Sequence, residues 1–295
     1  MSATGNRETA SQPGLFDGAP PSEIVAPVAL VDDDRVDVAV GYALHWGLPL
    51  RLVHVDTNGG GSDVFAALET MAERLGSSNP TLTVSAEMVE AGSVAGGVVA
   101  AANDRSVVVL PSARGSRWLD EESVAVGVVK ALRGLVMLHG PSCDDPPVGS
   151  SIIVPLDGSR FAEQALQPAF AIASRSGAPV WLVTVGPAAS VDAASEMLFE
   201  GIDDSERRYL KELTARFRDA ETDIRLETTD AADPVAGIDR LAAEHDSSLI
   251  VAATHGDSSG DRSRFGSVCL GLVEHGRVPA LLITGQTDSA ETNLN

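Results

Sequence analysis

An internal duplication constrains the fold of this chain more than any other feature of its sequence. Short apolar segments alternate with amphipathic segments of helical period in residues 24–140, and the same order returns in residues 151–285. Three stretches align between the halves, namely VALVDDDR with IIVPLDGSR, LRLVHVDT with VWLVTVGP, and VVVLPSARG with LIVAATHGD. Strands that alternate with helices of this length predict a parallel sheet with right-handed crossovers in each half.

The apolar runs and helical periods predict the elements of each half. In the N-terminal half we expect strands at 24–31, 48–55, 81–89, 107–110 and 135–138, and helices at 36–46, 62–75, 91–102 and 123–132. In the C-terminal half we expect strands at 152–156, 179–185, 222–228, 249–253 and 279–283, and helices at 161–176, 194–220, 234–245 and from 266 onward. The expected fold class is therefore α/β, with two tandem five-stranded, Rossmann-like parallel-sheet domains.

The segments outside the two halves are expected to be tails and a linker. Residues 1–23 have no periodic apolar pattern and are expected to be a disordered tail, residues 141–150 (PSCDDPPVGS) have the composition of a linker, and residues 286–295 form a second polar tail. The two domains would then span 24–140 and 151–285. Since the duplication supplies two similar faces in one chain, we expect the domains to pack as an internal pseudo-dimer.

Charge and cysteine content argue against several classes of function. The chain has 42 acidic and 21 basic residues, for a net charge of −21, which repels nucleic acid and anionic membranes. Its two cysteines, Cys143 and Cys269, are far apart, which fits a reducing compartment without a disulfide framework or a zinc site. The sequence shows neither the pattern of a signal peptide nor an apolar run of membrane-spanning length. We therefore expect a cytoplasmic protein that binds neither nucleic acid nor membranes.

A loop rich in Gly and Ser in the C-terminal half has the layout of a phosphate site. It contains Gly256, follows a predicted strand, and ends at Gly266 and Ser267, which open the next helix. Glycines let the backbone approach a ligand closely, and the first N–H groups of a helix have no partner within the helix. Arg262 supplies positive charge, whereas two aspartates of the loop oppose a polyphosphate unless they face solvent or hold a metal ion.

Asp157 follows the first strand of the same half, at the edge of an open parallel sheet where ligands bind. The alternative interpretation is that Asp157 and Ser159 only cap the next helix. His255 is the one histidine in the proposed site and suits a hydrogen-bonding role better than acid–base catalysis. The six histidines show no metal-ligand spacing, and no catalytic constellation is found.

These residues resemble the universal stress protein family, which has a five-stranded parallel α/β fold. Its ATP-binding members carry an aspartate after the first strand and a Gly-x2-Gly-x9-Gly-Ser/Thr loop. Residues 150–285 are similar to this family over nearly their whole length, with Asp157 at the first place and a loop that reads Ala253-x2-Gly256-x9-Gly266-Ser267. The departure is Ala253, whose methyl group would narrow the pocket without abolishing the design.

The resemblance implies an ATP site in the C-terminal domain, with or without Mg²⁺. The residues that it implies are Pro155, Leu156, Asp157, Val185, Ala253, Gly256, Arg262, Gly266, Ser267 and Val268. Asp157 and the backbone of the two residues before it would lie near adenosine, and Val185 would lie against the adenine. Arg262 falls where many members have an arginine, and the glycines with Ser267 and Val268 would hold the phosphates and the ribose.

The first half resembles the same family with a degenerate site. Asp32 aligns with Asp157, but Asp33 and Asp34 replace the Gly-Ser that follows. The corresponding loop, which begins at Leu110, lacks the glycines. Because added carboxylates oppose a polyphosphate, we expect no ATP binding in this half and a structural or regulatory role.

In this family, subunits often pair through the last strand, which here would join Leu135–Leu138 to Ala280–Ile283; a homodimer of the whole chain is a further option. The expected function is ATP binding in a stress-response or regulatory protein with an unidentified protein partner. Hydrolysis would be slow at most, since no general base is found. One alternative is a nucleotide-free interaction scaffold in which both sites have lapsed, as Ala253 and the acidic loop suggest. Another is an enzyme of the wider adenylate-using group, for which the sequence offers no catalytic loop.

Overall fold

The computed structural model of the chain describes residues 20–29, 35–59, 62–112, 123–143, 150–187, 208–215, 222–256 and 267–286. Most of the two expected tails and of the expected linker, much of the expected helix at 194–220, and the loop 257–266 lie outside these residues. The three consecutive aspartates at 32–34 lie outside them as well.

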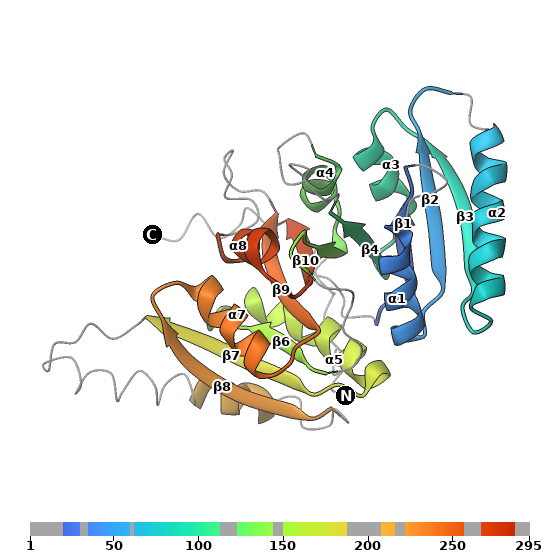
Figure 1. Ribbon diagram of the computed structural model, residues 1–295. Coiled ribbons are helices and arrows are strands. Elements are labelled where there is room, and N and C mark those ends of the chain that lie inside the picture. Colours follow the sequence, from blue (N-terminus) through green and yellow to red (C-terminus); the bar gives the residue numbers. More distant parts are fainter. Residues whose placement is uncertain are drawn as a thin grey trace, which may run out of the picture.

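All described strands join one ten-stranded sheet with the order β3-β2-β1-β4-β5-β10-β9-β6-β7-β8 (Figure 1). The strands of the N-terminal half are β1 (Glu23–Pro27), β2 (Leu50–Asp56), β3 (Val84–Glu90), β4 (Ser106–Pro111) and β5 (Gly134–His139). The strands of the C-terminal half are β6 (Ile152–Pro155), β7 (Val180–Pro187), β8 (Ile224–Ala231), β9 (Leu249–Gly256) and β10 (Ala280–Gln286). Neighbouring strands within each half are parallel, which confirms the predicted fold of two tandem parallel-sheet domains.

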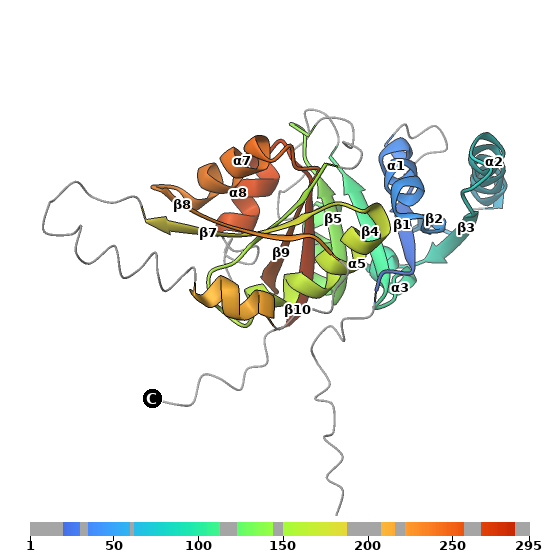
Figure 2. The same cartoon turned by 90° about the horizontal axis from the view of Figure 1, so that it is seen from below.

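Helices cover both faces of the sheet. They are α1 (Val36–Trp46), α2 (Ser62–Ser78), α3 (Val94–Ala101), α4 (Val124–Ala131), the 3-10 helix η1 (Ala162–Ala165), α5 (Leu166–Ser176), α7 (Pro234–Glu244) and α8 (Ser267–His275), with a further helical segment at 208–215. In the N-terminal half, α1 and α2 lie on one face of the strands and α3 lies on the other (Figure 2). The aliphatic cores expected from a chain with few aromatics form between these layers.

Local sequence signals explain where the helices begin and end. Ser93, Ser123 and Asp233 precede α3, α4 and α7, and their side-chain oxygens accept hydrogen bonds from backbone N–H groups of the first turns at 3.1, 3.2 and 3.1 Å. Gly47 ends α1 in the left-handed conformation with φ 61°, as its position in the sequence predicts. The expected strand at 24–31 is shorter than predicted, because the β1 ladder ends at Pro27.

The two halves join through their last strands. β5 pairs with β10 in antiparallel fashion, with Met137 opposite Leu281 and the flanking partners on either side (Figure 1). This register pairs Leu135–Leu138 with Ala280–Ile283 and so confirms the predicted pseudo-dimer contact. All of these side chains are buried. The arrangement is the intramolecular version of a two-fold interface, in which each domain contributes the equivalent surface.

Strand register also defines which residues of the two halves correspond, and it corrects one prediction. The N–H groups of Val28 and Leu156 each donate to the equivalent carbonyl of the neighbouring strand, at 2.8 Å in both halves. Val28 is therefore equivalent to Leu156, and the residue equivalent to Asp157 is Ala29. The alignment of Asp32 with Asp157 was wrong. It assumed that the apolar run continues as a strand to its last residue, whereas the ladder ends four residues earlier and the connection to α1 is longer.

Candidate functional site

The topology creates one candidate site in each half. In each half the first three strands run to one side, and the chain then crosses back to the other side of the first strand. The crossings place switch points between β1 and β4 and between β6 and β9. Ligands of open α/β sheets bind beyond the carboxyl ends of the strands at such points, because the connections there diverge and leave a crevice. The fold itself therefore indicates two sites of common origin.

At the C-terminal switch point, the end of β6 presents an exposed carboxylate. Leu156 is buried, whereas Asp157 is exposed. One carboxylate oxygen of Asp157 accepts a hydrogen bond from the N–H of Ser159 at 2.9 Å, and the Ser159 hydroxyl accepts one from Ala162 at the start of η1 at 3.1 Å. Gly158 between them has φ 83°, which favours glycine. The helix-starting role considered from the sequence is thus realised, and it holds the Asp157 carboxylate at the sheet edge.

The end of β9 lies against the first turn of α8. The thiol of Cys269 donates to the carbonyl oxygen of Ala253, with 3.5 Å between sulfur and oxygen. Ser267 and Val268, which begin α8, therefore lie close to the end of β9. Burial raises the pKa of the Cys269 thiol to about 11, so this cysteine is a packing residue and not a nucleophile at neutral pH.

Two close glycine contacts bring α7 and the end of β7 to the same edge. A Cβ on Gly237 of α7 would lie 2.9 Å from Cγ1 of Val185, which shows how closely the helix approaches this valine. A Cβ on Gly271 of α8 would lie 2.6 Å from Cγ2 of Val235 of α7. These contacts connect the end of β7 through α7 and α8 to the end of β9.

The structure thus brings most of the predicted site residues to one edge of the C-terminal half. These are Pro155, Leu156, Asp157, Val185, Ala253, Ser267 and Val268. Gly256 is the last residue of β9, and its backbone pairs with the end of β10. Arg262 and Gly266 lie outside the described residues. A binding role for all of these residues stays a prediction.

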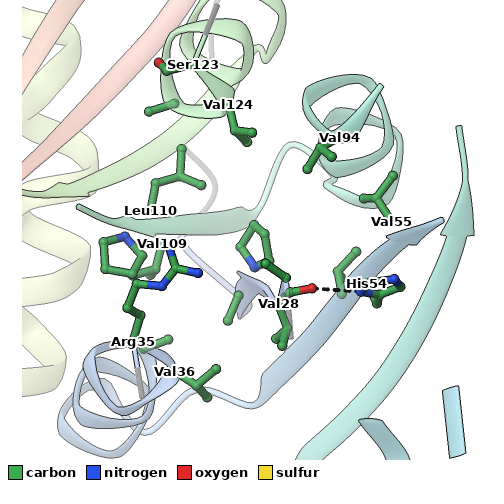
Figure 3. Close-up of a pocket in the computed structure, with 17 residues that line it drawn as sticks. Val28, Arg35, Val36, His54, Val55, Val94, Val109, Leu110, Ser123 and Val124 are labelled. Atoms are coloured by element: carbon green, nitrogen blue, oxygen red, sulfur yellow. Dashed lines mark hydrogen bonds between the residues drawn. The ribbon is translucent and has the colours of Figure 1, made fainter. Parts of the chain in front are cut away.

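A cavity of about 460 Å³ lies at the corresponding edge of the N-terminal half (Figure 3). It is bounded by the ends of β1, β2 and β4 and by the first turns of α1, α3 and α4. The sequence predicts only a degenerate site here, because the N-terminal half lacks the glycine loop of fixed spacing. The cavity is built instead from single valines, alanines and prolines of separate elements, which leave no motif in the sequence.

The duplication relates this cavity to the predicted C-terminal site. Strand register makes Val28, Ala29, Val55 and Pro111 equivalent to Leu156, Asp157, Val185 and Ala253. Gly127 approaches Ala95 between α4 and α3 as Gly271 approaches Val235 between α8 and α7, which makes Ser123 and Val124 equivalent to Ser267 and Val268. All six N-terminal equivalents line the cavity. The positions named for the C-terminal site are therefore positions that enclose a cavity in the other half.

The described residues contain neither a cluster of metal ligands nor a membrane-spanning helix. No group of three or more His, Cys, Asp or Glu side chains in this part of the chain could hold a metal ion. None of the helices in the described ranges is both long enough and apolar enough to cross a membrane.

Comparisons with known proteins agree with the fold and with the resemblance of the C-terminal half. Residues 150–284 match the model of the universal stress protein family. No curated protein matches the sequence. Among solved structures, a universal stress protein from Archaeoglobus fulgidus DSM 4304 is similar with a TM-score of 0.62 and 15% identity, over 89% of this chain and 98% of that one. Two further structures show that the same fold extends across both halves.

The first is a putative universal stress protein from Pseudomonas aeruginosa UCBPP-PA14, with a TM-score of 0.61 and 15% identity over 90% of this chain and 93% of that one. The second is the cytoplasmic domain of a prokaryotic cation chloride cotransporter, with a TM-score of 0.53 and 12% identity over 89% of this chain and 95% of that one. At these identities the likeness concerns the fold alone. It establishes that the tandem arrangement of the two domains occurs in other proteins.

Proposed function

We propose that the C-terminal half of the chain, in which residues 150–284 match the model of the universal stress protein family, binds an adenine nucleotide, ATP, with or without Mg²⁺. The protein would act in the cytoplasm in a stress response or in regulation. ATP would serve as a bound ligand that sets the conformation or the choice of an unidentified protein partner, with hydrolysis slow at most.

The observation that carries the proposal is the convergence of Asp157, Val185 and the β9–α8 junction at a topological switch point. The exposed Asp157 carboxylate repels phosphates and accepts hydrogen bonds, which suits the hydroxyls of a nucleoside. The first N–H groups of α8, beginning at Ser267, lie close to the end of β9 and suit phosphate oxygens. Apolar Leu156 and Val185 suit the base.

The internal duplication supports the same placement. Equivalent positions in the N-terminal half enclose a cavity of about 460 Å³, which is within the range of about 300–1,000 Å³ typical of small-molecule sites. The difference between the halves is chemical, since Asp157 has Ala29 as its equivalent.

The test is a measurement of bound nucleotide followed by titration. Protein purified without added ligand is denatured, and any released nucleotide is identified by chromatography. ATP is then titrated calorimetrically into wild type, Asp157→Ala and Asp230→Ala. Asp230 is a matched control, because it is an exposed aspartate at the end of β8, two strands away from β6 in the sheet.

We expect about one ATP for each chain, an affinity at least tenfold weaker in Asp157→Ala, and no change in Asp230→Ala. An absence of binding to wild type at millimolar ATP with Mg²⁺ would reject the proposal in favour of a nucleotide-free scaffold. Equal losses in the two variants would attribute the effect to net charge and not to this site.

A further inference from the structure

The cavity of the N-terminal half has walls suited to a ligand unlike ATP. We propose that it is a second binding site, which takes an uncharged, largely apolar small molecule. This inference concerns the other half of the chain and does not depend on nucleotide binding by the C-terminal half. It rests on the composition of the walls, on the state of the polar groups among them, and on two exposed valines at the mouth.

The walls of the cavity are aliphatic. Val28 at the end of β1, Val36 in α1, Val55 in β2, Leu110 in β4 and Val124 in α4 all contribute to it. These residues come from five elements that converge at the switch point between β1 and β4. A cavity of about 460 Å³ with such walls favours a ligand that gains by leaving water.

Three polar side chains that line the cavity, those of Arg35, His54 and Ser123, each already have a partner within the protein. The Nδ1–H of His54 donates to the carbonyl oxygen of Val28 at 2.9 Å (Figure 3). The Ser123 hydroxyl accepts the N–H of Val126 at 3.2 Å, and Arg35 is engaged in an interaction of its own. A ligand that enters the cavity therefore meets few unfilled hydrogen-bonding groups, and a charged ligand would lose its hydration without compensation.

Two exposed valines mark the mouth of the cavity. Among the described residues, the large apolar side chains with the greatest exposure are Leu44 at 40%, Val94 at 39% and Val124 at 36%. Val94 and Val124 both line the cavity, and Figure 3 shows them on the facing first turns of α3 and α4. The close contact between Gly127 and Ala95 holds these two turns together. A bound apolar ligand would cover the two side chains that the free protein leaves in water.

Charge in the surrounding sequence disfavours anions, ATP among them. Ala29 lacks the carboxylate that its equivalent Asp157 supplies to the other half, so a nucleoside meets no carboxylate acceptor at this place. In the chain, three aspartates directly precede Arg35 and two glutamates directly precede Ser123. The same carboxylates add repulsion toward phosphate.

The test uses N-phenyl-1-naphthylamine, an uncharged fluorophore whose emission rises in apolar surroundings. It is titrated into the full-length wild-type protein and into Val124→Asp and Leu44→Asp. Aspartate is compatible with the first turn of α4, where the helix dipole favours negative charge, so Val124→Asp is expected to fold. Leu44→Asp is the matched control, because Leu44 is equally exposed on α1 but does not line the cavity. Melting curves of the three proteins verify that they fold.

We expect saturable binding to wild type and to Leu44→Asp, an affinity at least tenfold weaker in Val124→Asp, and no displacement of the fluorophore by millimolar ATP. Weakening in Leu44→Asp equal to that in Val124→Asp would indicate non-specific adsorption and overturn the proposal. Displacement by ATP would also overturn it, since it would place the fluorophore in a nucleotide site. A change in the sedimentation of Val124→Asp with fluorophore binding unchanged would identify the mouth as a protein interface instead.

Discussion

The junction between the two domains should depend on one buried hydroxyl. Thr284, at the end of the β5–β10 ladder, is 2% exposed, and its Oγ1 donates to the carbonyl oxygen of Leu132 at 2.7 Å, with the Gly134 carbonyl at 3.2 Å. Thr284→Val keeps the shape of the side chain and removes the donor. A buried hydrogen bond contributes about 0.5–1.5 kcal/mol net, and an unsatisfied buried acceptor costs about 1–3 kcal/mol, so we expect a loss of about 1–3 kcal/mol.

The assay is urea unfolding followed by circular dichroism, with thermal melting as a second measure. Each kcal/mol corresponds to a fall of about 2–4 °C in melting temperature for a protein of roughly this size. Thr70→Val is the matched control, because the Thr70 hydroxyl donates to the Ala66 carbonyl at 2.9 Å on the exposed face of α2, where water can replace it. That variant should lose less than about 0.5 kcal/mol. Equal stabilities of Thr284→Val and Thr70→Val would refute the reasoning.

Three further predictions concern pH, thiol reactivity and packing. Burial alone would raise the pKa of the Glu23 carboxyl. Hydrogen bonds from Arg51, Ser106 and Asn103, together with the positive charge of Arg51, nevertheless hold this pKa below its ordinary value of 4.5. The stability that Glu23 contributes is therefore present above pH 4.5 and is lost as the pH falls through the lowered value, so unfolding free energies of Glu23→Gln should depend less on pH there. Because burial raises the pKa of Cys269 to about 11, a thiol reagent at pH 8 should modify it only on unfolding. Gly237→Ala places a methyl group 2.9 Å from Val185 and should lose about 1–3 kcal/mol in the same urea assay.

Each of these has a result that would contradict it. A pH profile of Glu23→Gln parallel to that of wild type would remove Glu23 from the account of acid stability. Modification of native Cys269 within minutes, read by mass spectrometry against half-buried Cys143, would show that its burial is transient. Gly285→Ala, whose Cβ would meet nothing within 4 Å, is the control for Gly237→Ala and should lose no stability, since alanine reduces the entropy of the unfolded chain. Equal losses in the two variants would mean that crowding against Val185 is not the cause.

The sequence sufficed for the fold because its signals are periodic and repeated. The helix at 36–46 and its glycine stop were predicted with the observed bounds. The duplication predicted a pseudo-dimer, and the resemblance to the family implied the strands that are observed at its junction. The predicted equivalence of Asp32 with Asp157 was wrong for a physical reason. An apolar run shows where a chain is buried, but the end of a strand depends on partners in the neighbouring strand, and β1 has none beyond Pro27 in the register.

The cavity could not be predicted because no local pattern encodes it. It depends on distances between helix axes, which Gly127 sets through its contact with Ala95, as Gly271 does through Val235 in the other half. A comparison of the two halves that includes these glycines would have paired Val124 with Val268, and so would have indicated a second site. Prediction of the chemistry of such a site would still require the strand register, which makes Ala29 equivalent to Asp157.

The duplication therefore preserves the frame of the site and lets its chemistry vary. The frame consists of backbone and glycine contacts that recur in both halves, since Gly97 approaches Val55 as Gly237 approaches Val185. A change in such a contact would move a helix and disturb the core. A change at the rim, as between Ala29 and Asp157, alters charge without touching the frame, because both positions are exposed. It follows that the two halves can take ligands of different chemistry at equivalent places while they keep one continuous sheet.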